Sequence, residues 1–524
     1  MEPSPFWVTC LIAMVIGAVL VWKLKATPRR VYKLPPGPRP WPVIGNFNLI
    51  GALPHRSIHE LSKKYGPLMH LRFGSYSVVV GSSVDMAKYF LKTHDVTFLD
   101  RPRTASGKHT TYNYSDITWS PYGAYWRQAR RMCLTEVFSA RRLASFEHIR
   151  ADEVRALVRG LFAECSPAQQ QGRVVHLNRD HLSTLSMNVI TRMVLGKRFF
   201  GEGAGADAAE GPVSSLAEFK WMLDELLLLN GVLNIGDWIP WLDWLDLQGY
   251  VRRMKRLGKM LDAFMEHVLD EHSERRRREG EGFVARDMVD VLMQLADDPT
   301  RLEVKLGRVG VKAFTQDLIA GGTESSSVTV EWAISELLRK PGVFAAATEE
   351  LDRVVGRGRW VAEKDLPCLP YLEAIVKETM RVHPIVPLLI PRVAREDAAV
   401  GGYDIPKGTR VLVNVWTIGR DPAIWEAPEE FLPERFMGSK MDVKGQDFEL
   451  LPFGSGRRMC PGYNLGLKVI QLSLANLLHG FTWRLPDGMA KEELSMDEVF
   501  GLSTTRKFPL QVVVEPKLPV GLYV

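Results

Sequence analysis

The sequence has few cysteines and no charge excess large enough to define a class. Its five cysteines among 524 residues are odd in number, far apart and without CxxC spacing, which argues against a disulfide framework and a structural zinc site. A reducing compartment fits this cysteine usage best. A formal charge of +6 over this length is too small for a protein that coats nucleic acid, so we expect no nucleic-acid partner.

The chain also lacks internal repeats and the composition of a disordered protein. Hydrophobic residues make up 46 % of it and charged residues 24 %, which is typical of a folded chain. Apolar residues recur at three- and four-residue spacing between about Asp85 and Val382. Because short β-type runs lie near both ends of the chain, we predict a mainly α-helical fold with a minor β-sheet region. The four predicted strands are 68–73, 77–80, 409–415 and 510–514.

Two polar stretches, 201–212 and 271–282, are predicted to be solvated loops rather than domain boundaries. Each lies between helical segments of similar composition. The second contains four consecutive arginines, Arg275 to Arg278, which we interpret as a solvated helix end and not as a nucleic-acid patch.

One long apolar run stands at the N-terminal end. Residues 3–22 carry no charge, and about 20 residues suffice to cross a ~30 Å hydrocarbon layer. A cleaved secretory signal begins with basic residues, whereas here the basic residues follow the run. We therefore predict a retained transmembrane anchor at 3–22 with the rest of the chain in the cytosol; a buried core helix is the alternative. The flanking charges are Glu2 before the run and Lys23, Lys25, Arg29, Arg30 and Lys33 after it.

The segment 23–45 is predicted to be a basic and proline-rich hinge. The closely spaced prolines of 34–45 favour an extended, stiff strip, which would hold a globular body at 46–524 at a set distance from the bilayer; an ordinary linker is the other interpretation. The apolar stretches 226–229 and 238–245, the second with three tryptophans, fit a second membrane contact, part of the core or the lid of an apolar pocket.

The segment 453–462 carries the strongest chemical signal. It reads Phe-Gly-Ser-Gly-Arg-Arg-Met-Cys-Pro-Gly, in which the glycines at 454, 456 and 462 permit a tight loop around the sulfur of Cys460. Arg457 and Arg458 supply positive charge that favours a thiolate, and a predicted helix at 463–478 directs its N-terminus towards it. From these residues alone, Cys460 is an activated cysteine that serves as a nucleophile or as a metal ligand.

Three other motifs become informative beside this loop. Glu378 and Arg381 lie three apart on a predicted helix and share a face. Trp126 and Arg130 lie one helical turn apart, so that an indole donor stands beside a guanidinium suited to hold a carboxylate. A predicted helix at 309–338 is interrupted by Gly-Gly-Thr-Glu-Ser-Ser at 321–326, which makes it locally irregular and leaves room for a ligand.

The cysteine loop resembles the haem-binding signature FxxGxRxCxG of the cytochrome P450 superfamily. Phe453, Gly456, Arg458, Cys460 and Gly462 match its fixed positions, and nearly the whole chain resembles the plant A-type microsomal members. The resemblance implies a cytochrome P450 fold and a haem b cofactor. It also implies that Cys460 is the proximal thiolate ligand, whose electron donation promotes cleavage of the O–O bond.

The same resemblance assigns roles to the other motifs. Glu378 and Arg381 are the family's ExxR and, with Arg435, imply a charge network around the ligand loop. Trp126, Arg130, Arg392 and Arg458 are similar to the partners of the haem propionates. Glu324 and Ser325 take the positions of an acid and an alcohol that deliver protons, with serine replacing the usual threonine and losing the methyl group that restricts χ1.

The implied function is a membrane-anchored haem-thiolate monooxygenase in the endoplasmic reticulum membrane. It would take electrons from NADPH through cytochrome P450 reductase and insert one atom of O₂ into a small apolar plant metabolite. The pocket would be bordered by mainly apolar segments, which favours a terpenoid substrate, including oxidative C–C cleavage of terpene alcohols to homoterpenes. These segments are 106–116, 216–238, 313–325, 386–390 and 502–504.

Three alternatives remain open from the sequence. The first is hydroxylation of a flavonoid or another phenolic. The second is rearrangement or dehydration of an oxygenated substrate without O₂ or reductase, against which the intact acid and alcohol positions argue. The third is a non-catalytic haem-binding sensor or scaffold, which the serine at 325 alone supports.

Overall fold

The computed structural model describes residues 32–165, 174–200, 216–298, 300 and 302–524. The predicted anchor at 3–22 and the predicted loop at 201–212 lie outside these residues. Within the described ranges, no helix is both long and apolar enough to span a bilayer.

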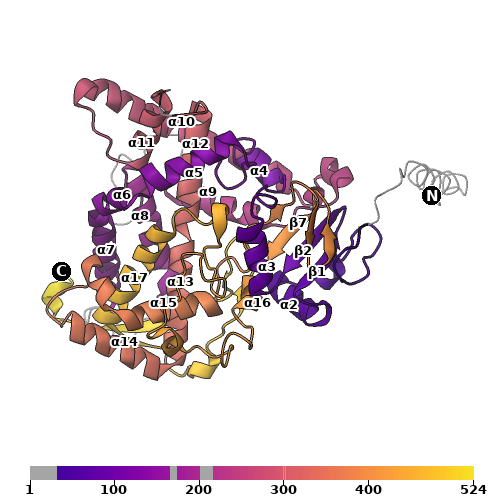
Figure 1. Ribbon diagram of the computed structural model, residues 1–524. Coiled ribbons are helices and arrows are strands. Elements are labelled where there is room, and N and C mark those ends of the chain that lie inside the picture. The colour runs from indigo at the N-terminus through magenta and orange to yellow at the C-terminus, as the bar shows by residue number, and fades with distance from the viewer. Residues whose placement is uncertain (1–31, 166–173, 201–215, 299, 301) are drawn as a thin grey trace, which may run out of the picture.

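Most of the described chain is helical (Figure 1). The helices are α2 (Pro54–Tyr65), α3 (Val84–Lys88), α4 (Ala105–Thr110), α5 (Ala124–Met132), α6 (Ala140–Ser145), α7 (Glu147–Cys165), α8 (Ser183–Leu195), α9 (Leu216–Gly231), α10 (Tyr250–Glu279), α11 (Met288–Asp297), α12 (Arg308–Thr323), α13 (Ser325–Arg339), α14 (Pro341–Val354), α15 (Pro370–Val382), α16 (Val415–Ile418) and α17 (Tyr463–Gly480).

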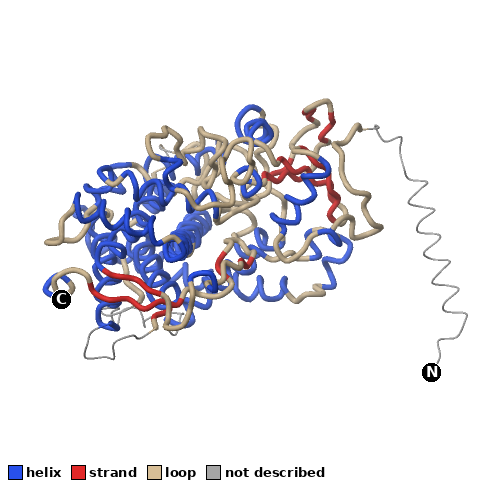
Figure 2. Tube along the Cα trace, turned by 90° about the horizontal axis from the view of Figure 1, so that it is seen from below, coloured by secondary structure: helices blue, strands red, loops and turns tan. Residues whose placement is uncertain are grey.

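The strands gather in two places, one towards the N-terminal end and one beside the C-terminus (Figure 2). They are β1 (Leu68–Phe73), β2 (Tyr76–Gly81), β3 (Val175–His176), β4 (Arg392–Val393), β5 (Ala398–Val400), β6 (Tyr403–Ile405), β7 (Arg410–Val413), β8 (Phe481–Arg484), β9 (Glu498–Val499), β10 (Thr505–Arg506) and β11 (Gln511–Pro516).

The larger sheet joins distant parts of the sequence. Its order is β1-β2-β7-β4, with β1 and β2 antiparallel and β2 and β7 parallel, so that Val79 pairs with Val411. Val78, Val79 and Val80 are fully buried because both faces of the sheet are covered. The predicted mainly helical fold with a minor sheet is confirmed, and β1, β2, β7 and β11 lie where the β-type runs predict them.

The C-terminal half of α10 differs from the prediction. The segment 271–279 is helix and not loop, since α10 continues to Glu279, while the interpretation of the arginine run as a helix end is confirmed. Arg275 pairs with Asp290, and Arg276 pairs with Asp297. The polar run forms a helix because acids of α11 neutralise its cations, a contact that local composition does not reveal.

The apolar stretches 226–229 and 238–245 divide between core and surface. Leu226 and Leu229 are buried, and Trp238 packs edge-on against Phe47 with ring centroids 5.6 Å apart. Trp241 and Trp244, in contrast, are 61 % and 80 % exposed. The stretch 238–245 therefore contributes both a residue that packs against the sheet region and an exposed apolar surface.

Candidate functional site

The loop 453–460 brings its cysteine to the start of α17. The backbone N–H of Cys460 donates to the carbonyl of Phe453 at 3.0 Å. Gly456 adopts φ 71°, and a Cβ there would lie 1.9 Å from the carbonyl oxygen of Leu91, so only glycine fits this approach. Gly462 has an ordinary φ of −90°, and a Cβ there would make normal contact with the ring of Phe138. Its backbone conformation thus does not require glycine.

The Cys460 side chain lies at the start of α17. Its surface is accessible, yet burial by the surrounding protein raises the pKa of its thiol, against the backbone N–H of Gly462 and the charge of Arg130. Arg130, which the sequence resemblance places with the propionate partners, is thus an arginine whose charge favours the thiolate. Arg457 pairs with Asp95 at 2.5 Å, and Arg458 donates to backbone carbonyls instead.

The junction of α12 and α13 packs near the start of α17. The two helices are separated at Glu324, as the interrupted pattern predicts. Gly321 is exposed although it lies in a mostly buried helix, and the hydroxyl of Ser325 donates to its carbonyl at 3.2 Å. A Cβ on Gly466 of α17 would lie 4.0 Å from the Ser326 hydroxyl, so the first turns of α13 and α17 are in contact.

Glu324 is placed to hold a proton. Burial raises the pKa of its carboxyl above the ordinary value, although a hydrogen bond with Ser503 opposes the shift. Burial of a carboxyl favours its neutral form. The Glu324 carboxyl and the Ser325 hydroxyl therefore belong to adjacent residues at the break in the helix. Both groups can take part in proton transfer.

Glu378, Arg381 and Arg435 form one network. Arg381 holds both oxygens of Glu378 at 2.7 Å, and both side chains are fully buried. Arg435 donates to the same carboxylate at 3.1 Å. The remaining donors of Arg381 hold three backbone carbonyls of the segment that precedes the ligand loop, those of Gly419, Pro428 and Glu430.

Four arginines surround the ligand loop without a carboxylate partner. Among the described residues, Arg101, Arg392 and Arg458 make no ion pair and donate to backbone carbonyls. Within those same ranges, the guanidinium of Arg130 makes neither a hydrogen bond nor an ion pair. Burial and the charges of neighbouring arginines lower the pKa of Arg101 and Arg458, and burial lowers that of Arg392. The indole N–H of Trp126 donates to the carbonyl of Ile117 at 3.0 Å, and its ring lies 4.1 Å from the Arg458 guanidinium.

These residues fit the haem that the sequence resemblance implies. Like charges buried together are costly unless an anion compensates them, and haem b carries two propionates. The sulfur of Cys460 and the backbone at Gly321 are both exposed, which leaves space for a flat group. Sequence reasoning missed Arg101; the only sequence signal was an arginine between Asp100 and Pro102, which is too short a pattern to separate from a surface cation.

The predicted pocket segments do meet. Ser106 donates to the amide oxygen of Asn230 at 2.6 Å, and a Cβ on Gly231 would lie 2.3 Å from the backbone nitrogen of Leu502. The backbone N–H of Thr504 donates to the carbonyl of Ile385 at 2.8 Å. The α4 region, α9, the β9–β10 connection and the segment after α15 are therefore in contact with one another in pairs.

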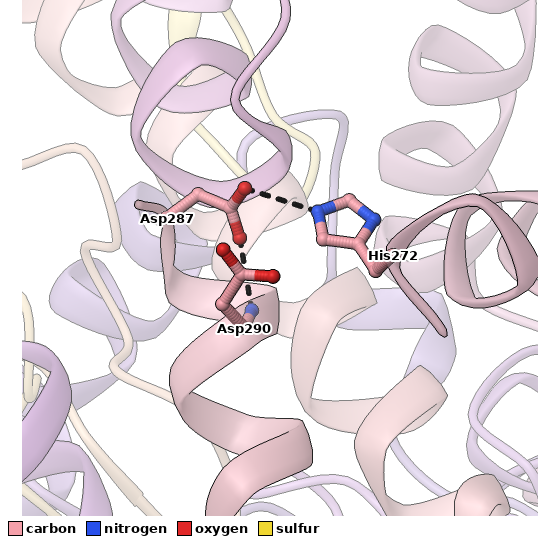
Figure 3. A group of neighbouring side chains, drawn as sticks. All are labelled: His272, Asp287 and Asp290. Carbon is pink, nitrogen blue, oxygen red and sulfur yellow. Dashed lines mark hydrogen bonds and ion pairs between the residues drawn. The ribbon is translucent and has the colours of Figure 1, made fainter. Parts of the chain in front are cut away.

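A second group of possible metal ligands lies elsewhere, between α10 and α11 (Figure 3). His272 faces Asp287 at 3.0 Å, and its other ring nitrogen lies 2.7 Å from the Val268 carbonyl. Arg275 contacts both Asp287 and Asp290. Burial lowers the pKa of His272, but the hydrogen bond and charge of Asp287 outweigh it and raise the pKa overall. The carboxylates are paired with Arg275 and hydrogen-bonded to His272, so we interpret the group as a structural cluster.

A surface cavity of about 660 Å³ is also separate from the ligand loop. It lies beside α7 and α8, near the C-terminus, and its lining is rich in charged side chains such as Asp152, Arg155 and Arg192. None of the residues discussed around Cys460 lines it. An open, charged cavity of this kind is not the place for apolar chemistry.

Comparisons with known proteins agree with this geometry. The family model described as Cytochrome P450 matches residues 35–510. The chain is 53 % identical to trimethyltridecatetraene synthase of Zea mays, over 98 % of this chain and 94 % of that protein, and 53 % identical to dimethylnonatriene synthase of Zea mays, over 98 % of each. It is 43 % identical to flavonoid 3'-monooxygenase of Petunia hybrida, over 98 % of each. A zebrafish cytochrome P450 structure with abiraterone superposes with a TM-score of 0.72 at 27 % identity, covering 89 % of this chain and all of that one.

Replacing Arg381 with methionine should destabilise the folded protein by about 3–5 kcal/mol, because Glu378 would remain as a buried, unpaired charge. Chemical denaturation followed by tryptophan fluorescence measures the loss. The matched control is Lys63→Ala, which breaks an exposed pair with the same three-residue spacing and should leave the midpoint unchanged. Equal midpoints for Arg381→Met and wild type would contradict the stabilising role of the network.

Proposed function

The chain belongs to the cytochrome P450 family, and we propose that this monooxygenase oxidises a terpene alcohol, with oxidative C–C cleavage to a homoterpene as the reaction. The observation that carries the proposal is the 53 % identity, over nearly the whole chain, to two maize enzymes whose names state such products.

We propose Cys460 as the residue that ligates haem, with its charge compensated by Arg130 and the N–H of Gly462. Arg101, Arg392 and Arg458, with Trp126, would hold the propionates, which supply the anions that these buried cations lack. A haem bound through a thiolate supplies the reductive activation of O₂ and the cleavage of its O–O bond.

Glu324 and Ser325 would move the protons that O₂ reduction consumes. The hydrogen bond from Ser325 to the carbonyl of Gly321 fixes the hydroxyl at the helix break, and Glu324 reaches Ser503 on the far side of the pocket. Because burial raises the pKa of Glu324, its carboxyl can give up a proton and regain one more readily than an exposed carboxylate. Serine retains the donor that threonine would supply, with a less restricted χ1.

The apolar lining supports a hydrocarbon-like substrate. Val386, Leu389 and Leu502 are half-buried where the pocket segments meet, so their side chains are available to an apolar ligand. The two maize product names denote hydrocarbons of 16 and 11 carbons, each four short of a diterpene or sesquiterpene skeleton. We therefore propose acyclic tertiary alcohols of these two sizes. Hydroxylation of a flavonoid, the activity named for the Petunia relative, is the competing outcome.

Electrons would come from NADPH through a reductase that docks behind the ligand loop. The surface there is basic: Arg127 and Arg131 of α5 and Arg457 of the loop are all exposed. Opposite charge on a partner would steer it to this surface. This arrangement supports an acidic electron-donating protein and leaves the substrate pocket on the other side free.

We propose that the chain is held at the endoplasmic reticulum membrane by residues 3–22, with its catalytic domain in the cytosol. The exposed Trp241 and Trp244 support a second contact on the same side. Trp238 just before them packs on Phe47, which follows the proline strip, so the strip and the exposed tryptophans adjoin one edge of β1 and β2. Tryptophans at such an edge suit a membrane interface.

The proposed reaction can be tested with microsomes that carry this chain and a plant reductase. Fed tertiary sesquiterpene and diterpene alcohols and a flavonoid in parallel, they should release the 11- and 16-carbon hydrocarbons. Cys460→Ala should abolish both the products and the carbon monoxide difference band typical of thiolate-bound haem. Cys368→Ala, at an exposed free cysteine, is the control and should retain both. Turnover of the flavonoid alone would overturn the terpenoid assignment.

Removing the Ser325 hydroxyl should uncouple electron use from product formation. We expect Ser325→Ala to lower the product formed per NADPH by about a hundredfold, the usual scale for a lost proton donor. Ser325→Thr should match or exceed wild type, because it keeps the donor. Measuring NADPH consumption together with product decides the point, and wild-type coupling in Ser325→Ala would exclude a role for this hydroxyl.

The second membrane contact should persist after the anchor is removed. We expect a chain that lacks residues 1–31 to cosediment with lipid vesicles, and the additional pair Trp241→Ser and Trp244→Ser to release it into the supernatant, because the exposed rings supply the apolar contact. Val284→Ser is the control. Val284 is also an exposed apolar residue, at 68 %, but it lies after α10 and outside the tryptophan stretch. Release by the control to the same extent would contradict a localised contact.

A further inference from the structure

The connection between α4 and α5 is strained where it borders the pocket. Tyr112, Asn113 and Tyr114 all have positive φ, between 52° and 64°, a conformation that costs side-chain-bearing residues about 1 kcal/mol or more each. A Cβ on Gly107 would lie 2.7 Å from the ring of Tyr114, so the loop folds back tightly on α4. Such a loop persists only where other contacts over-determine it.

Two adjacent residues of α12 hold the two ends of this loop. The side-chain amide of Gln316 donates to the carbonyl of Thr110 at 2.5 Å. One oxygen of Asp317 accepts the backbone N–H groups of Ile117 at 2.9 Å and Thr118 at 3.1 Å, and the Thr118 hydroxyl at 3.1 Å. Helix α12 therefore fixes both the entry and the exit of the strained segment.

A second carboxyl completes this attachment. Asp116 is fully buried, accepts the backbone N–H of Trp119 at 3.1 Å and shares a hydrogen bond with Asp317. Burial raises the pKa of both carboxyls, that of Asp317 to about 6, and the charge of Asp317 raises that of Asp116 further. The hydrogen bond between the two carboxyls lowers the pKa of Asp317, so Asp116 donates and Asp317 accepts. The charge of Asp116 also acts on the nearby Arg101 and Arg458.

The backbone carbonyls of Ile117 and Thr118 point towards the arginines around the ligand loop. The carbonyl of Ile117 accepts from Trp126 at 3.0 Å and from Arg458 at 3.2 Å, and that of Thr118 accepts from Arg101 at 3.1 Å. The peptide unit between Ile117 and Thr118 has its N–H held by Asp317 and its C=O bound to Trp126 and Arg458. The next unit has its N–H, that of Trp119, held by Asp116 and its C=O, that of Thr118, bound to Arg101. Only two peptide units separate the acid pair from those cations.

We propose that Asp317, together with Asp116, is a positioning residue: the two carboxyls fix the backbone of residues 117–119 so that the carbonyls of Ile117 and Thr118 hold Arg458, Trp126 and Arg101 where these meet the haem propionates. The proposal rests on the haem assignment above and adds a residue pair that does not touch the cofactor. It links α12, which ends just before the proton-transfer residues Glu324 and Ser325, to the edge of the haem through a single hydrogen-bonded layer.

The mechanism distinguishes hydrogen-bond acceptance from charge. In Asp317→Asn the amide oxygen still accepts from Ile117 and Thr118, and the amide N–H groups donate to Asp116, so the loop should keep its place. Asp317→Leu has a similar shape but accepts nothing, which leaves two backbone N–H groups unpaired. Thr315→Val is the matched control on the same helix, because the buried Thr315 hydroxyl bonds only within α12.

The test measures haem retention and potential in the purified holoprotein. We expect Asp317→Leu to lose haem to excess apomyoglobin about tenfold faster than wild type, which corresponds to one displaced charge-assisted contact. Its midpoint potential should fall, because propionate charge is less well compensated. Asp317→Asn and Thr315→Val should resemble wild type. A double-mutant cycle with Arg458→Met should be non-additive if the effect passes through that arginine.

Wild-type haem loss and potential in Asp317→Leu would overturn the proposal, as would equal defects in Asp317→Asn and Asp317→Leu or full additivity with Arg458→Met. If Asp317→Leu does not fold, Asp116→Leu takes its place, since it removes the shared donor and should shift both quantities in the same direction. The wild-type carbon monoxide spectrum reports on the haem assignment separately. A thiolate spectrum with an unaffected Asp317→Leu refutes the positioning role alone.

Discussion

The buried ion pair between Glu378 and Arg381 is the constraint on which the rest of the site depends. Neither side chain reaches solvent, so each charge is tolerable only because the other is present. Arg381 has donors left over, and these bind the carbonyls of Gly419, Pro428 and Glu430. One ion pair thereby orders an irregular stretch that has no sheet or helix to satisfy its backbone, and this stretch delivers the chain to the loop that carries Cys460.

The surroundings of Cys460 are defined by charge as much as by shape. Arg101, Arg392 and Arg458 lie buried near one another without a carboxylate partner among the described residues, an arrangement that is unfavourable until an anion arrives. Hydrogen bonds to backbone carbonyls hold these cations in place. These preorganised arginines lower the stability of the protein without its cofactor. They raise its affinity for a cofactor that carries two carboxylates.

Helix α12 and its continuation α13 carry residues with three different roles within a few turns. Asp317 holds the strained loop, Gly321 leaves the backbone of the helix exposed, and Ser325 with Glu324 supplies the proton-transfer groups. Because these residues follow one another at roughly helical spacing, a displacement of the helix would change all three together. The break at Glu324 is therefore a functional feature of a helix that is otherwise a rigid support.

The sequence alone determined the features that depend on short-range spacing. The helical and strand periodicities, the cysteine loop, the pair at 378 and 381 and the interruption at 321–326 all lie within a few residues of one another, so local geometry fixes what they can do. Only the tertiary structure decided which cation acts on the sulfur, that Arg101 joins the cluster, that Asp116 meets Asp317 across two hundred positions, and that the polar run at 271–279 is helical. Each of these depends on charges that become neighbours only when distant segments pack and exclude water. The energy of a charge is set by what surrounds it, and the order of residues along the chain does not reveal those surroundings.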